Sequence, residues 1–241
     1  MPTKIRSALT VSRRTLVIAL IAVVALLTTV LVGGEAYARH SVASCVSRQF
    51  EKEMGSKIDV GFGAKPMLVT WVDGKLPEVN VNSDDVKFGP AVGMRVHAKF
   101  HDVEVTDNGR GGAAIGRSTA DITWSNDGIG KTLGGLVSDV ASSPTEGKLT
   151  LDVLGGVAQV SVQPRVAADT VQVEIESAHV LGIGLPTDLV QEIADLLSQS
   201  LQVYPFEMRP TGVQVTDDGL RVQLAGGPAQ MPAGTEGSSS C

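Results

Sequence analysis

Apolar and polar residues alternate along most of this chain of 241 residues. Ile58, Val60 and Phe62 alternate with more polar or smaller neighbours, and the same rhythm recurs at 149–153, 160–162, 171–175 and 220–224. A period of two is typical of β-strands that have one buried and one solvated face. Such strands usually pair antiparallel, because parallel strands that lie between helices are apolar on both faces. The sequence therefore predicts a largely antiparallel β protein.

Two of the expected strands change phase partway. In 94–106 the apolar set is Met94, Val96, Ala98 and Phe100, and then it moves by one residue to Val103 and Val105. Residues 83–85 interrupt the alternation between Val81 and Val86 in the same way. A one-residue slip indicates a β-bulge, which bends a strand and increases its twist. We therefore expect a long, curved sheet.

Three segments have helical periodicity, 39–54, 129–141 and 186–203. The last begins with Pro186, a residue suited to the first position of a helix. Segment 129–141 contains Gly130, Gly134 and Gly135, each of which costs about 1 kcal/mol of helix stability relative to alanine. It has an apolar stripe with poor helix propensity, which makes it a candidate for a movable lid. The expected class is α+β, a bulged antiparallel sheet wrapped around amphipathic helices.

The N-terminal segment has the pattern of an export signal or a membrane anchor. Residues 1–15 contain four basic and no acidic side chains, and 16–32 are apolar apart from two threonines. We expect a cytoplasmic segment at 1–15, a transmembrane segment at 16–34, a domain at 39–225 outside the cytoplasm and a Gly/Pro/Ser-rich tail at 226–241. The triplet Ala36-Tyr37-Ala38 keeps cleavage near Ala38, and hence a secreted protein, open as the alternative.

The net charge of the exported part disfavours some classes of binding partner. Of 20 basic residues four precede residue 39, and of 26 acidic residues one does, so the remainder carries a net charge of −9. This charge disfavours nucleic acid and wholesale adsorption to anionic lipid. Any contact with lipid is therefore expected to be local and apolar.

The chain contains two cysteines, Cys45 and Cys241. Outside the cytoplasm such a pair usually forms a disulfide. The flexible composition of the tail would let Cys241 return to the helix that carries Cys45. An unpaired terminal thiol is the alternative.

Catalytic and metal-binding patterns are absent from the sequence, which lacks GxSxG, HExxH and CxxC. Residues 125–132 end like a phosphate-binding loop, but Ser125 stands where its first glycine belongs, so we interpret the segment as a helix start capped by Ser125 or Asp127. His97 and His101 would lie about 13 Å apart on one strand, too far to share a metal ion. We expect neither an enzyme nor a cofactor.

Residues 66–81, PMLVTWVDGKLPEVNV, are apolar almost throughout, with one break at Asp73-Gly74. Asp73-Gly74 has the chemistry of a tight hairpin turn, so two strands are expected to flank it. The candidate lipid-facing side chains of the whole chain are Val69, Trp71, Val79, Val81, Phe88, Val96, Phe100, Leu133, Leu136, Val140, Leu189 and Ile193. Arg95, His97 and Lys99 are either a stripe that receives an anionic head group or simply a solvated strand face.

The order of elements resembles that of the LmeA-like phospholipid-binding proteins of high-GC Gram-positive bacteria. The resemblance is sharpest at Ile58-Asp59-Val60-Gly61-Phe62-Gly63, Pro66-Met67-Leu68 and Asp73-Gly74-Lys75-Leu76. This chain has Met67-Leu68 where the family usually has Phe-Leu after the proline. The resemblance implies a tubular lipid-binding fold, a half barrel, and binding of phospholipid without defined catalytic residues.

The leading hypothesis from the sequence is a protein of the cytoplasmic membrane that binds or carries phospholipid or another acyl lipid outside the cell, in envelope lipid or lipoglycan biogenesis. Aliphatic side chains can line a cleft for acyl chains, or they can fill a core completely. The alternative is therefore a structural or adaptor module of the cell envelope with a packed core.

Overall fold

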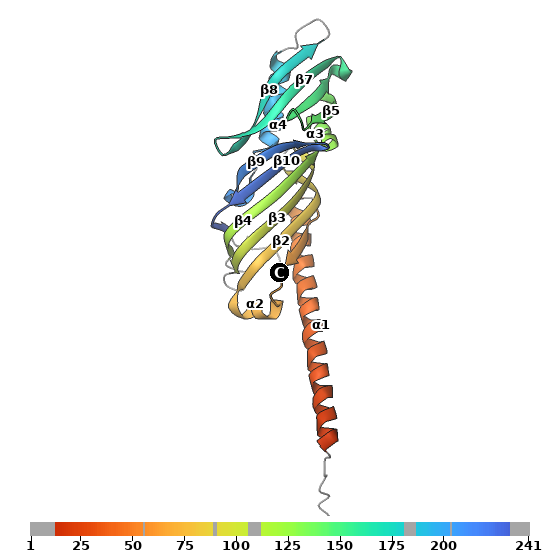
Figure 1. Ribbon diagram of the computed structural model, residues 1–241, viewed down its shortest axis with the longest axis vertical. Helices are drawn as coiled ribbons and strands as arrows, with labels where there is room; N and C mark the ends of the chain where they lie inside the picture. The colour runs from red at the N-terminus through yellow and green to blue at the C-terminus, as the bar shows by residue number, and fades with distance from the viewer. Residues whose placement is uncertain are drawn as a thin grey trace, which may run out of the picture.

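The computed structural model describes residues 13–54, 56–88, 91–105, 112–180, 187–202 and 204–231. Two antiparallel sheets and one long N-terminal helix dominate the molecule (Figure 1). The expected α+β class is confirmed, and its strands divide between two sheets.

The larger sheet has seven strands, in the order β1-β2-β3-β4-β10-β9, and β11 pairs with the outer part of β4. The strand bounds are β1 Asp59–Phe62, β2 Lys75–Phe88, β3 Ala91–Val105, β4 Ala113–Ser125, β9 Arg209–Thr216, β10 Gly219–Gly226 and β11 Ala229–Met231.

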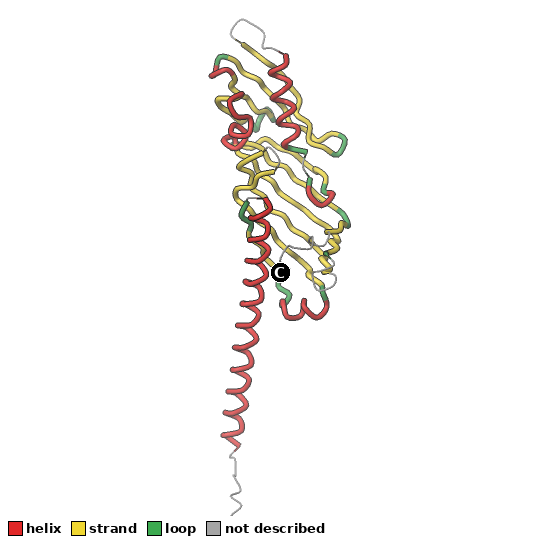
Figure 2. Tube along the Cα trace, turned by 180° about the vertical axis from the view of Figure 1, so that it is seen from behind, coloured by secondary structure: helices red, strands yellow, loops and turns green. Residues whose placement is uncertain are grey.

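The smaller sheet has four strands in chain order. They are β5 Val137–Ser143, β6 Lys148–Val153, β7 Ala158–Ala167 and β8 Thr170–Val180. Helix α4 (Thr187–Ser200) packs against β8, so the predicted helix at 186–203 covers this smaller sheet (Figure 2).

The predicted strand irregularities occur where the alternation breaks. The pairing of β2 with β3 shifts between Ser83 and Val86, which confirms the bulge there. Asp102 has φ 54°, in the left-handed region, while the pairing on either side of it keeps one register. The phase change at Asp102 is therefore a local reversal of the backbone rather than an inserted residue.

Helix α1 (Arg13–Met54) is continuous from the apolar segment into the domain. The predicted helix at 39–54 is its last third. Segment 17–48 of α1 is long and apolar enough to cross a membrane. Ala38 and Val42 pack against the hydrophobic core, and the Ser47 hydroxyl donates to the Ile58 carbonyl, 2.5 Å away, so the end of α1 is part of the folded domain.

Two predicted elements at the ends of the large sheet are wrong. Residues 66–81 do not form a hairpin, because 67–73 are helix α2 (Met67–Asp73) and Gly74, at φ 68°, ends that helix. The predicted helix at 129–141 is helical only in its first part. Helix α3 (Asn126–Leu133) is followed by the short 3₁₀ turn η2 (Gly134–Leu136) and then by β5, so the lid helix that we expected does not form.

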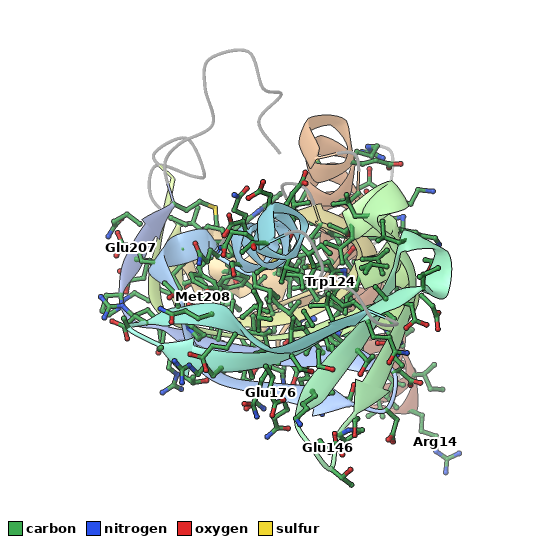
Figure 3. The ribbon with its side chains drawn as sticks, turned by 90° about the horizontal axis from the view of Figure 1, so that it is seen from above. Arg14, Trp124, Glu146, Glu176, Glu207 and Met208 are labelled. Atoms are coloured by element: carbon green, nitrogen blue, oxygen red, sulfur yellow. The ribbon has the colours of Figure 1, made fainter. Side chains whose placement is uncertain are left out.

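The α3 start agrees with the sequence interpretation, since the Ser125 hydroxyl accepts from the Gly128 N–H. The remaining short turns are η3 (Leu154–Gly156) and η4 (Pro205–Glu207). Seen from above, the side chains of Trp124 and Met208 lie in the interior, and Glu146 and Arg14 lie at the periphery (Figure 3).

Candidate functional site

One face of the seven-stranded sheet is apolar across five adjacent strands. Val81 lies opposite Ala98, Ala98 opposite Ala120, and Ala120 opposite Leu224. Residues directly opposite each other in antiparallel strands share a face. A parallel row consists of Val96, Ile122, Val222 and Val213. The registers therefore build one continuous aliphatic surface from β2 to β9.

Part of this surface is not fully packed. Six aliphatic side chains on it are only partly buried, and we call them the valine face: Val79, Val81, Val96, Ile122, Val213 and Val215. An acyl chain could cover the exposed part of this aliphatic surface, since such a ligand needs apolar contact and few polar groups.

A buried hydroxyl lies next to the valine face. Ser118 on β4 is 1% exposed, and its Oγ has no hydrogen-bond partner among the described residues. Its strand neighbours are Phe100 on β3 and Gly226 on β10. A Cβ built on Gly226 would meet this Oγ at 2.5 Å, so the glycine makes room for the hydroxyl. An unpaired buried hydroxyl costs about 1–3 kcal/mol.

The turn η4 packs over Phe100, the neighbour of Ser118 on β3. The Phe206 ring packs edge-on against the Phe100 ring, with centroids 5.2 Å apart. Phe206 and Glu207 have φ values of 54° and 55°, which non-glycine residues adopt only at a cost. The contact between the rings holds this strained turn in place over the sheet.

The lipid-facing candidates from the sequence separate into three groups. Val79, Val81 and Val96 belong to the valine face, and Leu136 is half-buried on η2. Val69 and Trp71 are exposed on α2. The remaining described candidates are core residues, namely Phe100, Leu133, Val140 and Ile193. The side chains of Phe88 and Leu189 lie outside the described part of the structure.

The head-group candidates lie on the other side of the sheet. Arg95, His97 and Lys99 are exposed, while their neighbours Met94, Ala98 and Phe100 are buried, so the two sets project to opposite faces of β3. His97 Nδ1 lies 3.0 Å from Asn82 Oδ1 on the same outer face. This placement favours the solvated-face interpretation of the three residues.

A junction between α1 and α2 was not predicted. Glu35 Oε1 accepts from the Met67 N–H at 2.7 Å and from Arg39 Nε at 2.6 Å. The Arg39 guanidinium also donates to the carbonyls of Phe62, Gly63 and Lys65. The only sequence signal was the spacing of Glu35 and Arg39, which places them one turn apart on a continuous helix.

The far end of α2 is held by a second ion pair. Lys65 Nζ lies 2.6 Å from Asp73 Oδ2 and also donates to the Lys75 carbonyl. The hydrogen bond from Lys65 holds the pKa of Asp73 below its ordinary value, and the Lys75 N–H lowers the pKa further. Both ends of this short helix are thus fixed by charged side chains.

Within the described ranges, no group of three or more His, Cys, Asp or Glu side chains could hold a metal ion. Cys45 lies on α1, and Cys241 lies outside the described residues, so the Cys45–Cys241 disulfide stays a prediction.

Comparison with known proteins agrees with the resemblance in the sequence. Residues 29–225 match the family model described as LmeA-like phospholipid-binding. Uncharacterized proteins from two strains of Mycobacterium tuberculosis and from Mycobacterium bovis are 30% identical over 234 residues, which is 92% of this chain. The aligned region spans 66% of the length of each relative, just under two thirds. No solved structure matches.

Proposed function

Because the chain belongs to the LmeA-like phospholipid-binding family, we propose that it binds the acyl chains of phospholipid on the valine face. The observation that carries this proposal is the half-covered aliphatic surface across β2, β3, β4 and β9. The proposed activity is binding without a chemical step.

Burial of the acyl chain would drive this binding. Each CH₂ group that leaves water contributes about 0.8 kcal/mol. Aliphatic side chains offer no directional contacts, so the length and number of chains would be selected by the available surface rather than by hydrogen bonds. The Ser118 hydroxyl lies next to this surface without a hydrogen-bond partner among the described residues, and it could donate one hydrogen bond to an ester oxygen of the lipid.

We place this activity at the cytoplasmic membrane, with the domain outside the cell. The basic residues before the apolar run of α1 support this orientation, because Lys and Arg are enriched on the cytoplasmic side. The alternative, a secreted protein cleaved near Ala38, predicts a shorter chain. The intact mass of the protein isolated from cells distinguishes the two.

Native mass spectrometry of the gently purified protein tests lipid binding. We expect co-purified phospholipid in the natural protein and in Thr119→Asp, whose side chain is exposed on β4. Ile122→Asp, on the same strand but within the valine face, should lose the lipid while circular dichroism remains native. Retention of lipid by Ile122→Asp would contradict the proposed site.

An adaptor with a packed core is the second candidate. The complete burial of Leu133 and Ile193, both expected to face lipid, favours it. This function predicts a domain that purifies without lipid and fails to take up labelled phospholipid from vesicles.

We further propose that binding serves transport within the envelope. Transfer of labelled phospholipid between two vesicle populations, accelerated by the protein and not by Ile122→Asp, is the expected result. Deletion of the gene should then change the lipid or lipoglycan composition of the envelope. Normal composition would remove the role in envelope biogenesis without affecting the binding site.

A further inference from the structure

Helix α2 presents an apolar face to solvent. Met67 and Thr70 point inward and are buried, while Leu68, Val69, Trp71 and Val72 are exposed. Trp71 is 71% exposed and Val72 is 89% exposed, which is unusual for large apolar side chains in adjacent positions. The outward surface of this helix contains one ionisable residue, Asp73, and that residue is paired with Lys65.

The position of α2 along α1 is fixed by Glu35. The apolar run of α1 occupies 16–34 and ends one residue before Glu35, which binds the first backbone N–H groups of α2. Nineteen helical residues span about 28 Å, close to the roughly 30 Å hydrocarbon thickness of a bilayer. Figure 1 shows α2 beside α1 at the lower end of the large sheet, with the apolar part of α1 continuing below it.

Helix α2 is also held rigidly at that level. Arg39 binds three carbonyls of the segment that leads into α2, and Lys65 joins the start of this region to Asp73 at its end. Gly74 then ends the helix in the left-handed conformation, and its carbonyl accepts from the Val105 N–H of β3. The exposed side chains of α2 therefore stay at a fixed position along α1, next to the end of its apolar run.

The charges around α2 are neutralised in pairs. Glu35 pairs with Arg39, Lys65 with Asp73, and Lys75 with Glu104. A surface with paired charges and apolar side chains does not select an anionic partner. It suits the boundary between head groups and acyl chains, where tryptophan is enriched because its ring is apolar and its N–H is polar.

We propose that α2 inserts Leu68, Val69, Trp71 and Val72 into the membrane leaflet at which the apolar run of α1 ends. This inference rests on the proposed membrane anchor. Two attachments to one bilayer, α1 across it and α2 in its surface, then prevent the domain from tilting or turning about α1. The lower edge of β2 and β3, which leads to the valine face, stays at the level of the lipid head groups.

Tryptophan fluorescence of the full chain in phosphatidylcholine vesicles tests this proposal. The chain has two tryptophans, and Trp124 is 1% exposed, so subtraction of the Trp71→Phe spectrum isolates the emission of Trp71. We expect emission at shorter wavelength than for Trp71 in water. We also expect strong quenching by lipids brominated near the head group and weak quenching by lipids brominated near the chain end. Emission typical of water, with no quenching by either lipid, would overturn the proposal.

A charged substitution supplies the matched variant. Val72→Asp should lose the quenching of Trp71 while the unfolding transition is unchanged, because Val72 is almost wholly exposed. Val157→Asp is the control, because Val157 is also an exposed valine. It directly precedes β7 of the four-stranded sheet, and that sheet lies at the opposite end of the molecule from α2 (Figure 1). Since the contact is apolar, added salt should leave the quenching of the natural protein unchanged. Loss of quenching in salt would contradict an apolar insertion.

The outcomes separate this inference from the proposals on which it rests. If an alkaline wash removes the chain from the vesicles, α1 does not anchor it in the bilayer. The α2 proposal then fails together with the anchor. A retained chain whose Trp71 stays in water overturns the α2 proposal alone. Lipid in the native mass spectra of Val72→Asp shows that the valine face is intact, so a loss of Trp71 quenching in that variant is specific to α2.

Discussion

The Glu35 carboxylate lies 2.7 Å from the backbone nitrogen of Met67, although the two residues are 32 positions apart in the chain. The first N–H groups of a helix have no partner within the helix, and Pro66 at the N-cap offers no side-chain acceptor. Glu35 supplies this acceptor from another helix. Helix α2 therefore depends on α1 for the capping that most helices obtain from a local residue.

Replacement of Glu35 by alanine should loosen α2 selectively. The N–H groups of Met67 and Leu68 would lose their acceptor, and Arg39 would lose its carboxylate partner while keeping its backbone acceptors. We expect faster hydrogen exchange in peptides that cover 64–74, measured by mass spectrometry. Glu51→Ala, an exposed substitution on the same helix, should leave that exchange unchanged. Equal exchange in both variants would mean that Glu35 does not stabilise α2.

Gly226→Ala should destabilise the large sheet. The new methyl group would approach Ser118 Oγ at 2.5 Å and Met208 Cγ at 3.1 Å. Overpacking of this kind costs about 1–3 kcal/mol in the free energy of unfolding. Gly227→Ala is the control, because nothing lies within 4 Å of its Cβ position. Denaturant titration of the two variants should separate them by that amount.

Two buried serines should respond to alanine with opposite signs. Ser118→Ala removes an unpaired hydroxyl and should raise the free energy of unfolding by about 1 kcal/mol. Ser83→Ala removes a hydroxyl that donates to the Lys57 carbonyl at 2.5 Å, and should lower the free energy of unfolding by about the same amount. Destabilisation by Ser118→Ala would indicate that the hydroxyl has a partner in solution.

Stability should decrease at alkaline pH through Tyr204. Burial raises the pKa of Tyr204, and the Val171 N–H that donates to its oxygen opposes this shift more weakly. The folded state therefore retains the phenolic proton, and the unfolded chain releases it first, from about pH 10 upward. The contribution is complete below that pH and is lost as pH rises toward the folded pKa. Unfolding titrations on both sides of pH 10 should show a smaller decrease in Tyr204→Phe.

The strands could be predicted from the sequence because burial of one strand face makes apolar and polar residues alternate along the chain. Val96, Ala98 and Phe100 fall on one face of β3 as expected, and the irregularity at 83–86 was visible as a change of phase. The order of strands in the sheets could not be predicted, because the same alternation fits many pairings. Only half of the valine face was among the lipid-facing candidates from the sequence, because Ile122, Val213 and Val215 were not included.

Helix α2 could not be predicted because its local sequence fits two structures. Val69, Trp71 and Val72 favour a strand, and Asp73-Gly74 is common both in hairpins and at helix ends. The Glu35 carboxylate favours the helix, but a contact across 32 residues leaves no local pattern. The early end of α3 was easier to predict, because Gly134 and Gly135 have low helix propensity and weaken the longer helix that we expected.

Helix α1 continues without a break from Arg13 to Met54. A helix of 42 residues is about 63 Å long and stiff on the scale of this domain. The domain and the apolar run therefore form one stiff unit, so the depth at which the run lies in a bilayer would set the height of the four-stranded sheet above it.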